Sequence, residues 1–239
     1  MIIISIYGKI VEVNKLYEAE KNIMFSLMNK YYDNMMKTAF LRDLDEKDYC
    51  ILLYNKDGEI KGFSTQKLME VKLEEETIRG VFSGDTIIDR DYWGSLELYK
   101  VFVRHFITFG RKFDKFYWFL ISKGYKTYKI LPVFLNEYYP NYKIATPPYE
   151  QSIMHALGKA KFPDEYDEDK GVVCYKKGKD RLKEGIADIT EQKLKDKHIE
   201  FFNKINPGYI NGDDVVCLAS LKADNLNKTA KRLLFSVKE

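Results

Sequence analysis

The sequence predicts an α/β (α+β) protein with a mixed, mostly antiparallel, twisted sheet that is flanked by helices. Residues 2–7 form a β-branched apolar run, which is followed by a helical apolar stripe. A hairpin signal joins two strand-like runs between residues 49 and 64, and residues 116–121 form a continuous apolar run typical of a strand covered on both faces. The chain has 239 residues, 45% of them hydrophobic, which is enough for a single domain, 1–239, with a substantial core.

Two consecutive helices are expected after the first strand. Asn14 is a candidate N-cap, and the apolar residues behind it recur on one helical face up to Tyr31. Asp33 can cap a second, shorter helix in which Met36 and Phe40 share a face. The second strand is therefore expected only near residue 49.

An antiparallel hairpin is the next expected element. The runs 49–54 and 60–64 are both strand-like, and Asn55-Lys56-Asp57-Gly58 between them has the chemistry of a tight turn. A further strand follows at residues 77–89, after an acidic turn. Three neighbouring antiparallel strands are therefore expected in this part of the chain.

The alternation within residues 77–89 assigns their side chains to the two faces of the strand. Counting by two places Asp85 on the same face as Arg79 and Ser83. Gly84 lies inside the strand, where a glycine commonly marks a bulge or a close approach to the backbone. We therefore expect an irregularity at Gly84.

A largely buried helix and a central strand follow. The turn Tyr92-Trp93-Gly94-Ser95 leads into an apolar stripe that ends at Gly110. Residues 116–121 are the next strand, and residues 126–139 are expected to form a helix. Because proline is tolerated in the first turn of a helix but not in its interior, this helix either starts near Leu131, with Pro132 in its first turn, or is kinked.

Residues 141–239 are expected to complete or extend the sheet as a decorated C-terminal portion. Their expected elements are a helix over 150–160, strands at 172–175 and 215–218, a helix from Thr190 to about residue 202, and a last helix after Asp224. No internal repeat or interdomain linker is visible, which favours one continuous domain.

Composition and spacing exclude several classes of function. The formal net charge of +3 is too small for a broad nucleic-acid-binding field, and the lysines at 112–129 are interpreted as a solvated face. The three cysteines and three histidines have no metal-ligand spacing, so no metal site is expected. The apolar first residues are too short to cross a bilayer and lack a cleavage site, so a cytoplasmic protein without a membrane span is expected.

The order of elements over residues 1–140 resembles the GNAT superfamily of acyl-CoA-dependent acyltransferases. The resemblance is sharpest at residues 82–95, which are similar to the family's fourth strand and to the turn that opens its central helix. In that family the turn carries the pattern Q/R-x-x-G-x-G/A. Aligned on Gly94, the first position of the pattern is Asp91 and the last is Leu96, so this sequence keeps one of the three signature positions.

The resemblance implies how an acyl donor is held. The donor is an acyl thioester of CoA or of a phosphopantetheine carrier, and backbone N–H groups of the turn bind its pyrophosphate, as helix N-termini bind anions in general. The alternative is that Gly94 only permits a tight turn between strand and helix. The Ser122 hydroxyl, at the end of its strand, either contacts the pantetheine arm or caps a turn. The donor-binding residues implied in this way are Ile87, Ile88, Arg90, Trp93, Gly94, Ser95 and Ser122.

Two residues are candidates for the chemistry of acyl transfer. Aminolysis of a thioester needs a base for the amine proton and a group that protonates or stabilises the departing thiolate. By the resemblance, Asp85 lies beside the thioester as the base; the alternative is that it pairs with Arg79 or caps a bulge amide. Tyr139, or its neighbour Tyr138, matches the position of a tyrosine acid in the family; the alternative is ordinary aromatic packing.

Two functions of different classes remain open. The first is an acyltransferase that moves an acyl group from a thioester to an amine acceptor of unknown identity. The second is a non-catalytic ligand-binding or protein-interaction module on the same fold, because Asp91 and Leu96 depart from the family pattern. Aromatic residues near the expected cleft favour an acyl group or acceptor that is not small and polar. The helix expected at 190–202 either walls the acceptor side or forms a homodimer contact.

Overall fold

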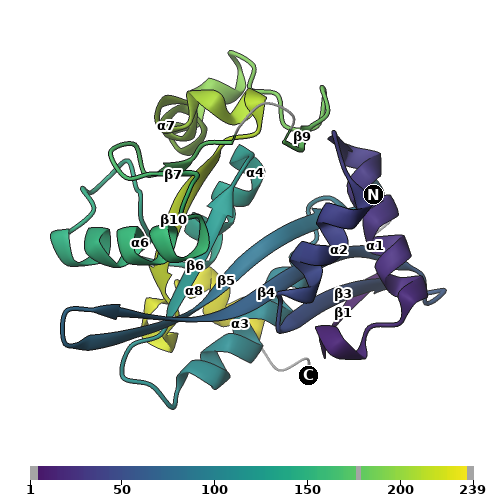
Figure 1. Ribbon diagram of the computed structural model, residues 1–239, viewed down its shortest axis with the longest axis horizontal. Helices are drawn as coiled ribbons and strands as arrows, with labels where there is room; N and C mark the ends of the chain where they lie inside the picture. The colour runs from purple at the N-terminus through teal and green to yellow at the C-terminus, as the bar shows by residue number, and fades with distance from the viewer. Residues whose placement is uncertain (1–4, 176–178, 236–239) are drawn as a thin grey trace.

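The structure is a computed structural model that describes residues 5–175 and 179–235. Its centre is a sheet in the order β1-β3-β4-β5-β6-β10-β8-β7, in which β5 and β6 are parallel and the other neighbours are antiparallel (Figure 1). The strands of this sheet are β1 (Ile6–Glu12), β3 (Tyr49–Asn55), β4 (Ile60–Leu73), β5 (Glu76–Ile88), β6 (Tyr117–Ser122), β7 (Tyr166–Asp167), β8 (Val172–Val173) and β10 (Asp214–Ser220). A second, two-stranded sheet pairs β2 (Tyr32–Asp33) with β9 (Arg181–Leu182).

Helices cover both faces of the large sheet, so the expected fold class is confirmed. Alternate residues of β3 show the two layers: Ile51 and Leu53 pack in a core with α3, α5 and α8, whereas Cys50 and Leu52 pack against α1 and α2. A third cluster lies between the sheet and α6. The helices are α1 (Glu18–Tyr31), α2 (Lys37–Asp45), α3 (Glu97–Gly110), α4 (Tyr125–Tyr128), α5 (Ile130–Phe134), α6 (Pro148–Lys161), α7 (Lys197–Ile205) and α8 (Lys228–Phe235).

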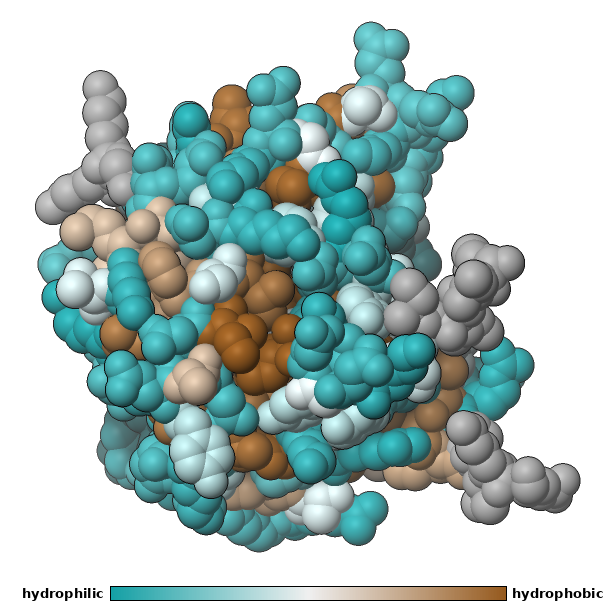
Figure 2. All heavy atoms as spheres, turned by 90° about the vertical axis from the view of Figure 1, so that its right-hand side faces the viewer, coloured by the Kyte–Doolittle hydropathy of each residue, from teal (hydrophilic) through white to brown (hydrophobic). Residues whose placement is uncertain are grey.

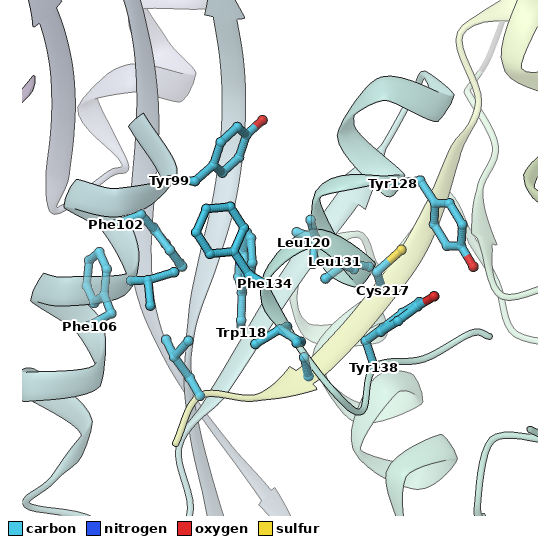
Figure 3. Close-up of a cluster of buried hydrophobic side chains, with 14 of the residues drawn as sticks. Tyr99, Phe102, Phe106, Trp118, Leu120, Tyr128, Leu131, Phe134, Tyr138 and Cys217 are labelled. Carbon is cyan, nitrogen blue, oxygen red and sulfur yellow. The ribbon is translucent and has the colours of Figure 1, made fainter. Parts of the chain in front are cut away.

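The core between α3, β6 and α5 fixes the start of α3 relative to the end of β6. The Phe102 and Trp118 rings lie 4.6 Å apart between centroids, and Phe134 of α5 fills the space beside them (Figure 3). Trp118 also donates from its indole Nε1 to the Ser83 hydroxyl of β5 at 2.9 Å. The turn that precedes α3 and the chain that leaves β6 are therefore held at fixed positions beside the same end of the sheet.

The first elements differ from the expectation in their bounds. The first strand, expected at residues 2–7, runs from Ile6 to Glu12, and residues 2–4 of the expectation lie outside the described residues. Asp33 does not cap the second helix, which begins at Lys37 after Met36. Asp33 instead pairs with Arg181 in the small sheet, a partner that no local pattern could reveal.

The hairpin expected between residues 49 and 64 is confirmed, but its second strand is longer. β4 continues to Leu73 and forms with β5 a ribbon that projects from the sheet (Figure 1). The strand expected at 77–89 corresponds closely to β5.

Residues 126–139 do not form one helix, contrary to the expectation. α4 and α5 are separate short helices, and Pro132 lies in the first turn of α5, where its missing N–H is tolerated. The chain is extended beyond α5, and the Tyr139 N–H donates to the Leu218 carbonyl of β10 at 2.8 Å.

The C-terminal portion adds the far edge of the sheet. α6, β8, β10 and α8 are found close to their expected positions. The helix expected from Thr190 begins only at Lys197, and Asp196 caps it by accepting from the His198 N–H at 2.9 Å. None of the helices within residues 5–175 and 179–235 has the length and apolar character that a membrane crossing requires.

Candidate functional site

A bulge interrupts β5 at the expected glycine. Ser64 of β4 lies opposite Thr86, but Gln66 lies opposite Ser83, so two residues of β5 face one residue of β4. A Cβ at Gly84 would lie 2.9 Å from the Thr65 hydroxyl and 3.0 Å from Cε of Lys47. Only glycine fits this close approach, and the expected irregularity at Gly84 is confirmed.

The bulge reverses the side to which the following residues point. Before it, Ser83 accepts from Trp118 on the α3 side of the sheet. After it, Ile87 packs with α1 and α2 on the opposite side, and Asp85, two residues earlier, shares this side. The expectation that Asp85 shares a face with Ser83 and Arg79 is therefore wrong, because the count by two did not include the extra residue.

Beside the bulge, β5 and β6 separate. They pair only from Gly80 to Ser83 and from Tyr117 to Leu120; beyond this point β5 stays with β4, while β6 continues with β10. The gap is a cavity of about 510 Å³. It is lined by β5 beyond the bulge, the turn before α3, the end of β6, α4, the end of α6 and the segment 179–187.

The side of the molecule that carries α1 and β9 is hollowed. Hydrophobic side chains gather in this hollow, and hydrophilic ones border it (Figure 2). The cavity lining has the same mixed character, since Ile87, Ile88 and Leu96 line it together with Asp85 and Lys123. Apolar and charged groups of a ligand could therefore both find complementary surfaces in it.

Asp85 is the carboxylate in the cavity that lacks a partner. Within the described residues it makes no hydrogen bond or ion pair, whereas Arg79 binds Glu70 at 2.7 Å. Burial raises the pKa of Asp85 to about 6, and the nearby carboxylates of Asp43 and Asp180 add to this effect. The positive charges of Lys47 and Lys179 oppose the shift. A carboxylate of this pKa is ionised at neutral pH and still takes up a proton readily, which suits a general base.

A buried lysine supports the bulge from behind. The side chain of Lys47 is fully buried, and its ammonium group forms an ion pair with Asp43 and donates to the Asp43 carbonyl at 3.0 Å. Burial lowers the pKa of Lys47. Its positive charge favours the ionised form of Asp85.

The opposite wall of the cavity carries a second buried ion pair. Lys123, just beyond β6, lies 3.1 Å from the Asp214 carboxylate and 3.8 Å from that of Asp180. Its ammonium group also lies 4.8 Å from the centre of the Tyr175 ring. The sequence placed Lys123 in a solvated basic face; its side chain is instead mostly buried because the chain beyond β8 folds over it.

The chain has similarity to known proteins at the level of structure. No protein-family model and no curated protein sequence matches the chain. The chain resembles solved structures of GNAT-type N-acyltransferases. One is a conserved protein of unknown function from Enterococcus faecalis, named as a probable N-acyltransferase: identity is 12%, the TM-score is 0.42, and the match covers 56% of this chain and 33% of that one.

Two further structures show the same degree of similarity. A GNAT-family N-acetyltransferase from Escherichia coli in complex with CoA has 12% identity and a TM-score of 0.36, with 50% of this chain and 64% of that one covered. A histone acetyltransferase HPA2 and related acetyltransferase from Corynebacterium glutamicum has 9% identity and a TM-score of 0.39, with 59% and 92% covered. The chain thus spans about a third of the length of the first structure and under two thirds of the second.

Most residues expected to hold a donor line the cavity. These are Ile87, Ile88, Trp93, Gly94 and Ser95. Gly94 has a φ of +92°, which other residues adopt only with strain, and there is open space beside it. A ligand could therefore approach the backbone at the start of α3 closely.

Two expected donor-binding residues do not line the cavity. Arg90 is exposed, and its guanidinium lies 5.2 Å from the centre of the Trp93 ring, at the outside of the turn. Ser122 is fully buried and faces the core rather than the opening. Its position at the end of β6 had suggested contact with the pantetheine arm or a capping role, but Ser122 is still within the sheet, where it lies opposite Val215 of β10.

The structure does not bring the tyrosine candidates to Asp85. Tyr139 is buried in the cluster beneath α6 and pairs with β10. The Tyr138 hydroxyl lies 3.1 Å from His198 Nδ1, outside the cavity lining. Both differ from the expectation because residues 135–139 are extended rather than helical.

The chain beyond β8 lines the cavity through a segment that the sequence did not single out. Residues 179–187, called the strap below, contribute Leu182, Ile186 and Ala187 to the lining. α7, the helix expected to wall the acceptor side, packs on α4 and contributes no lining residue. The strap was missed because β9 has only two residues and its partner strand is far away in the sequence.

Proposed function

We propose that this protein transfers an acyl group from an acyl thioester of CoA, or of a phosphopantetheine carrier, to an amine. The observation that carries the proposal is the Asp85 carboxylate at the bulge, where β5 and β6 separate, which has no hydrogen-bond or ion-pair partner among residues 5–175 and 179–235. Burial, together with the Asp43 and Asp180 carboxylates, raises its pKa to about 6, and the cavity gives a substrate access to it.

The gap between the parallel strands suits an extended donor arm. Beyond Ser83 of β5 and Leu120 of β6 these two strands no longer pair with each other. The backbone N–H and C=O groups on their facing edges are therefore available to a ligand. A pantetheine arm contains amide groups and can add to such an edge as a peptide strand does. The free space beside Gly94 would accept the phosphate end of the donor at the start of α3.

The reaction needs one proton transfer at Asp85. The amine nitrogen attacks the thioester carbonyl, the N–C bond forms, and Asp85 takes the N–H proton, directly or through one water. The tetrahedral intermediate then collapses, the C–S bond breaks, and the thiolate leaves. The proton held by Asp85 returns to the thiolate through solvent, so that an amide and a free thiol are the products.

The proposal is tested by measuring thiol release and donor binding together. Acetyl-CoA and longer acyl-CoAs are titrated calorimetrically, and free thiol is followed with a set of primary amines. Asp85→Asn is expected to lower kcat/KM by ~10²-fold or more with unchanged donor affinity, because general-base catalysis typically contributes that much. The matched control is Asp114→Asn, an exposed carboxylate in the loop between α3 and β6 that does not line the cavity, which should leave both quantities unchanged.

Two outcomes would contradict the proposal. If no acyl thioester binds, the cavity serves another ligand. If a thioester binds but no amine is acylated, the protein is a ligand-binding module on this fold, which is the alternative that the degenerate turn suggested.

A further inference from the structure

The strap crosses the open end of the cavity from one wall to the other. Its first part pairs with the chain that leaves α1, and its last part packs on the turn between β6 and α4. Figure 1 shows β9 beside the end of α1. The strap therefore bridges the two walls that the separation of β5 and β6 creates.

The attachment to the α1 side combines a strand pair with helix capping. Tyr32 lies opposite Leu182, and Asp33 opposite Arg181, with an ion pair of 3.8 Å between the last two side chains. Lys183 donates from its backbone N–H to the Tyr31 carbonyl at 3.0 Å and from its ammonium group to the Asn29 carbonyl at 2.8 Å. These bonds satisfy carbonyl groups at the end of α1, which otherwise lack intrahelical partners.

The attachment to the β6 side is tight and apolar. A Cβ at Gly124 would lie 3.1 Å from Leu182 and 3.2 Å from Ala187, so the strap lies directly on the backbone of this turn. Lys126 donates to the Ile186 carbonyl at 2.7 Å. Both ends of the strap are therefore held by specific contacts.

The charges beside Asp85 are largely neutralised by the protein itself. Of the four carboxylates that line the cavity, three have a lysine partner: Asp43 pairs with Lys47, Asp180 with Lys179 and Asp214 with Lys123. Asp85 is the fourth and has no partner within the described residues. Within the described residues, Asp85 is thus the carboxylate of the lining without an ion pair, and Lys126, which binds the Ile186 carbonyl, is a lysine of the lining without one.

We propose that the acceptor is a small-molecule monoamine with an apolar body, and that the strap excludes amines of proteins and peptides. The inference rests on the proposed function. The acceptor nitrogen must reach Asp85 on the α1 side of β5, and the strap spans this side.

The size and chemistry of the cavity support this acceptor class. About 510 Å³ must hold both the reacting end of the donor and the acceptor, which leaves room for a compact molecule but none for a peptide that continues in two directions. Phe82, Phe162 and Tyr32 of the lining offer an apolar surface. A second amino group on the acceptor would meet Lys126, which lines the cavity and has no carboxylate partner within the described residues, and would be repelled by it.

The first test compares acceptors on the wild-type chain. Thiol release from an acyl-CoA is measured with phenethylamine, with spermidine, and with short peptides that offer an α-amine or a lysine side chain. The monoamine is expected to exceed the peptides in kcat/KM by ~10²-fold or more, the order of discrimination that pocket shape provides. Spermidine is expected to fall clearly below the monoamine.

The second test loosens the strap. Asp33→Ala combined with Arg181→Ala removes the ion pair of the strand pair and should reduce the preference for the monoamine over peptides by at least a few-fold. The matched control is Glu12→Ala, which removes an exposed ion pair with Lys15 far from the cavity and should leave the preference unchanged.

The possible failures are distinguishable. Peptide amines acylated as fast as the monoamine, or a preference unaffected by loosening the strap, would overturn the acceptor assignment and leave the proposed acyl transfer intact. Absence of thiol release with every amine would overturn the proposed function and this inference with it.

Discussion

Replacing Asp85 by Asn should make the folded protein more stable while it removes activity. Asn keeps the size and the hydrogen-bonding shape of Asp but carries no charge. The wild-type carboxylate has no partner within the described residues, and its pKa of about 6 lies well above the ordinary 3.8. The fold therefore disfavours the ionised form, and at neutral pH that form is the one present.

The magnitude follows from the two pKa values. Raising the pKa of a carboxyl from 3.8 to about 6 corresponds to about 3 kcal/mol of destabilisation once the group is fully ionised. Because the Asn amide must also be desolvated, a gain of about 1–3 kcal/mol is expected for the variant. For a chain of this size, each kcal/mol raises Tm by roughly 2–4 °C.

The pH dependence distinguishes this effect from a general change in packing. The folded state of the wild type binds the Asp85 proton more tightly than the unfolded state, so wild-type stability falls as pH rises from about 4 to about 6. Below this pH range the Asp85 carboxyl is protonated in both the folded and the unfolded state, so it does not reduce the free energy of unfolding. The advantage of Asp85→Asn should therefore appear between pH 4 and 6 and stay constant above that range.

The assay is thermal unfolding of both proteins from pH 4 to pH 8, with Asp91→Asn as the exposed control. A lower Tm of Asp85→Asn at pH 8 would refute the reasoning, since it would identify Asp85 as a structural anchor with a favourable partner. A gain in Tm that did not change with pH would refute the assigned pKa.

Three further substitutions have defined outcomes. Lys47→Met removes a charge that favours ionised Asp85, so the acid limb of the kcat/KM profile should move to higher pH, and Lys47→Arg should restore its position. Ser83→Ala leaves the buried Trp118 indole N–H without an acceptor, so the free energy of unfolding should fall by about 1–3 kcal/mol with no shift of the pH profile. Gly124→Val inserts atoms where the strap touches the turn, and faster hydrogen exchange confined to residues 179–187 is expected; an unchanged exchange pattern would contradict the packing described.

The elements predicted best from the sequence are those with a strong periodicity of apolar residues and with residues typical of turns at their ends. The β3–β4 hairpin and α3 (Glu97–Gly110) have both, and they lie where expected. The prediction of one helix over residues 126–139 was wrong. Their apolar spacing fits one long helix as well as two short ones, and the extended chain after α5 is stabilised by pairing with β10. The conformation of such a segment is determined by its pairing with a strand far away in the sequence, and the local sequence pattern contains no information about that pairing.

The candidate site was predicted in part for the same reason. Asp85 and the turn at Gly94 were identified from residues near one another in the sequence, and so was the irregularity at Gly84. The strap and the buried ion pair of Lys123 with Asp214 depend on residues that meet only in the folded chain. Tyr139 was misplaced because its expected helix does not exist.

The bulge in β5 explains why the sheet holds an unfavourable carboxylate at residue 85. A regular strand would place residue 85 on the α3 side, among the aromatic side chains around Trp118. The extra residue at Gly84 turns Asp85 to the side of α1 and α2, where Lys47 lies behind the bulge and the opening lies in front. The same bulge ends the pairing of β5 with β6, which leaves the donor edge free. One extra residue in a strand thus creates the free edge and the position of Asp85. In the proposed reaction Asp85 must accept a proton, and the stability lost by keeping it ionised, with no partner among the described residues, is the cost of that role.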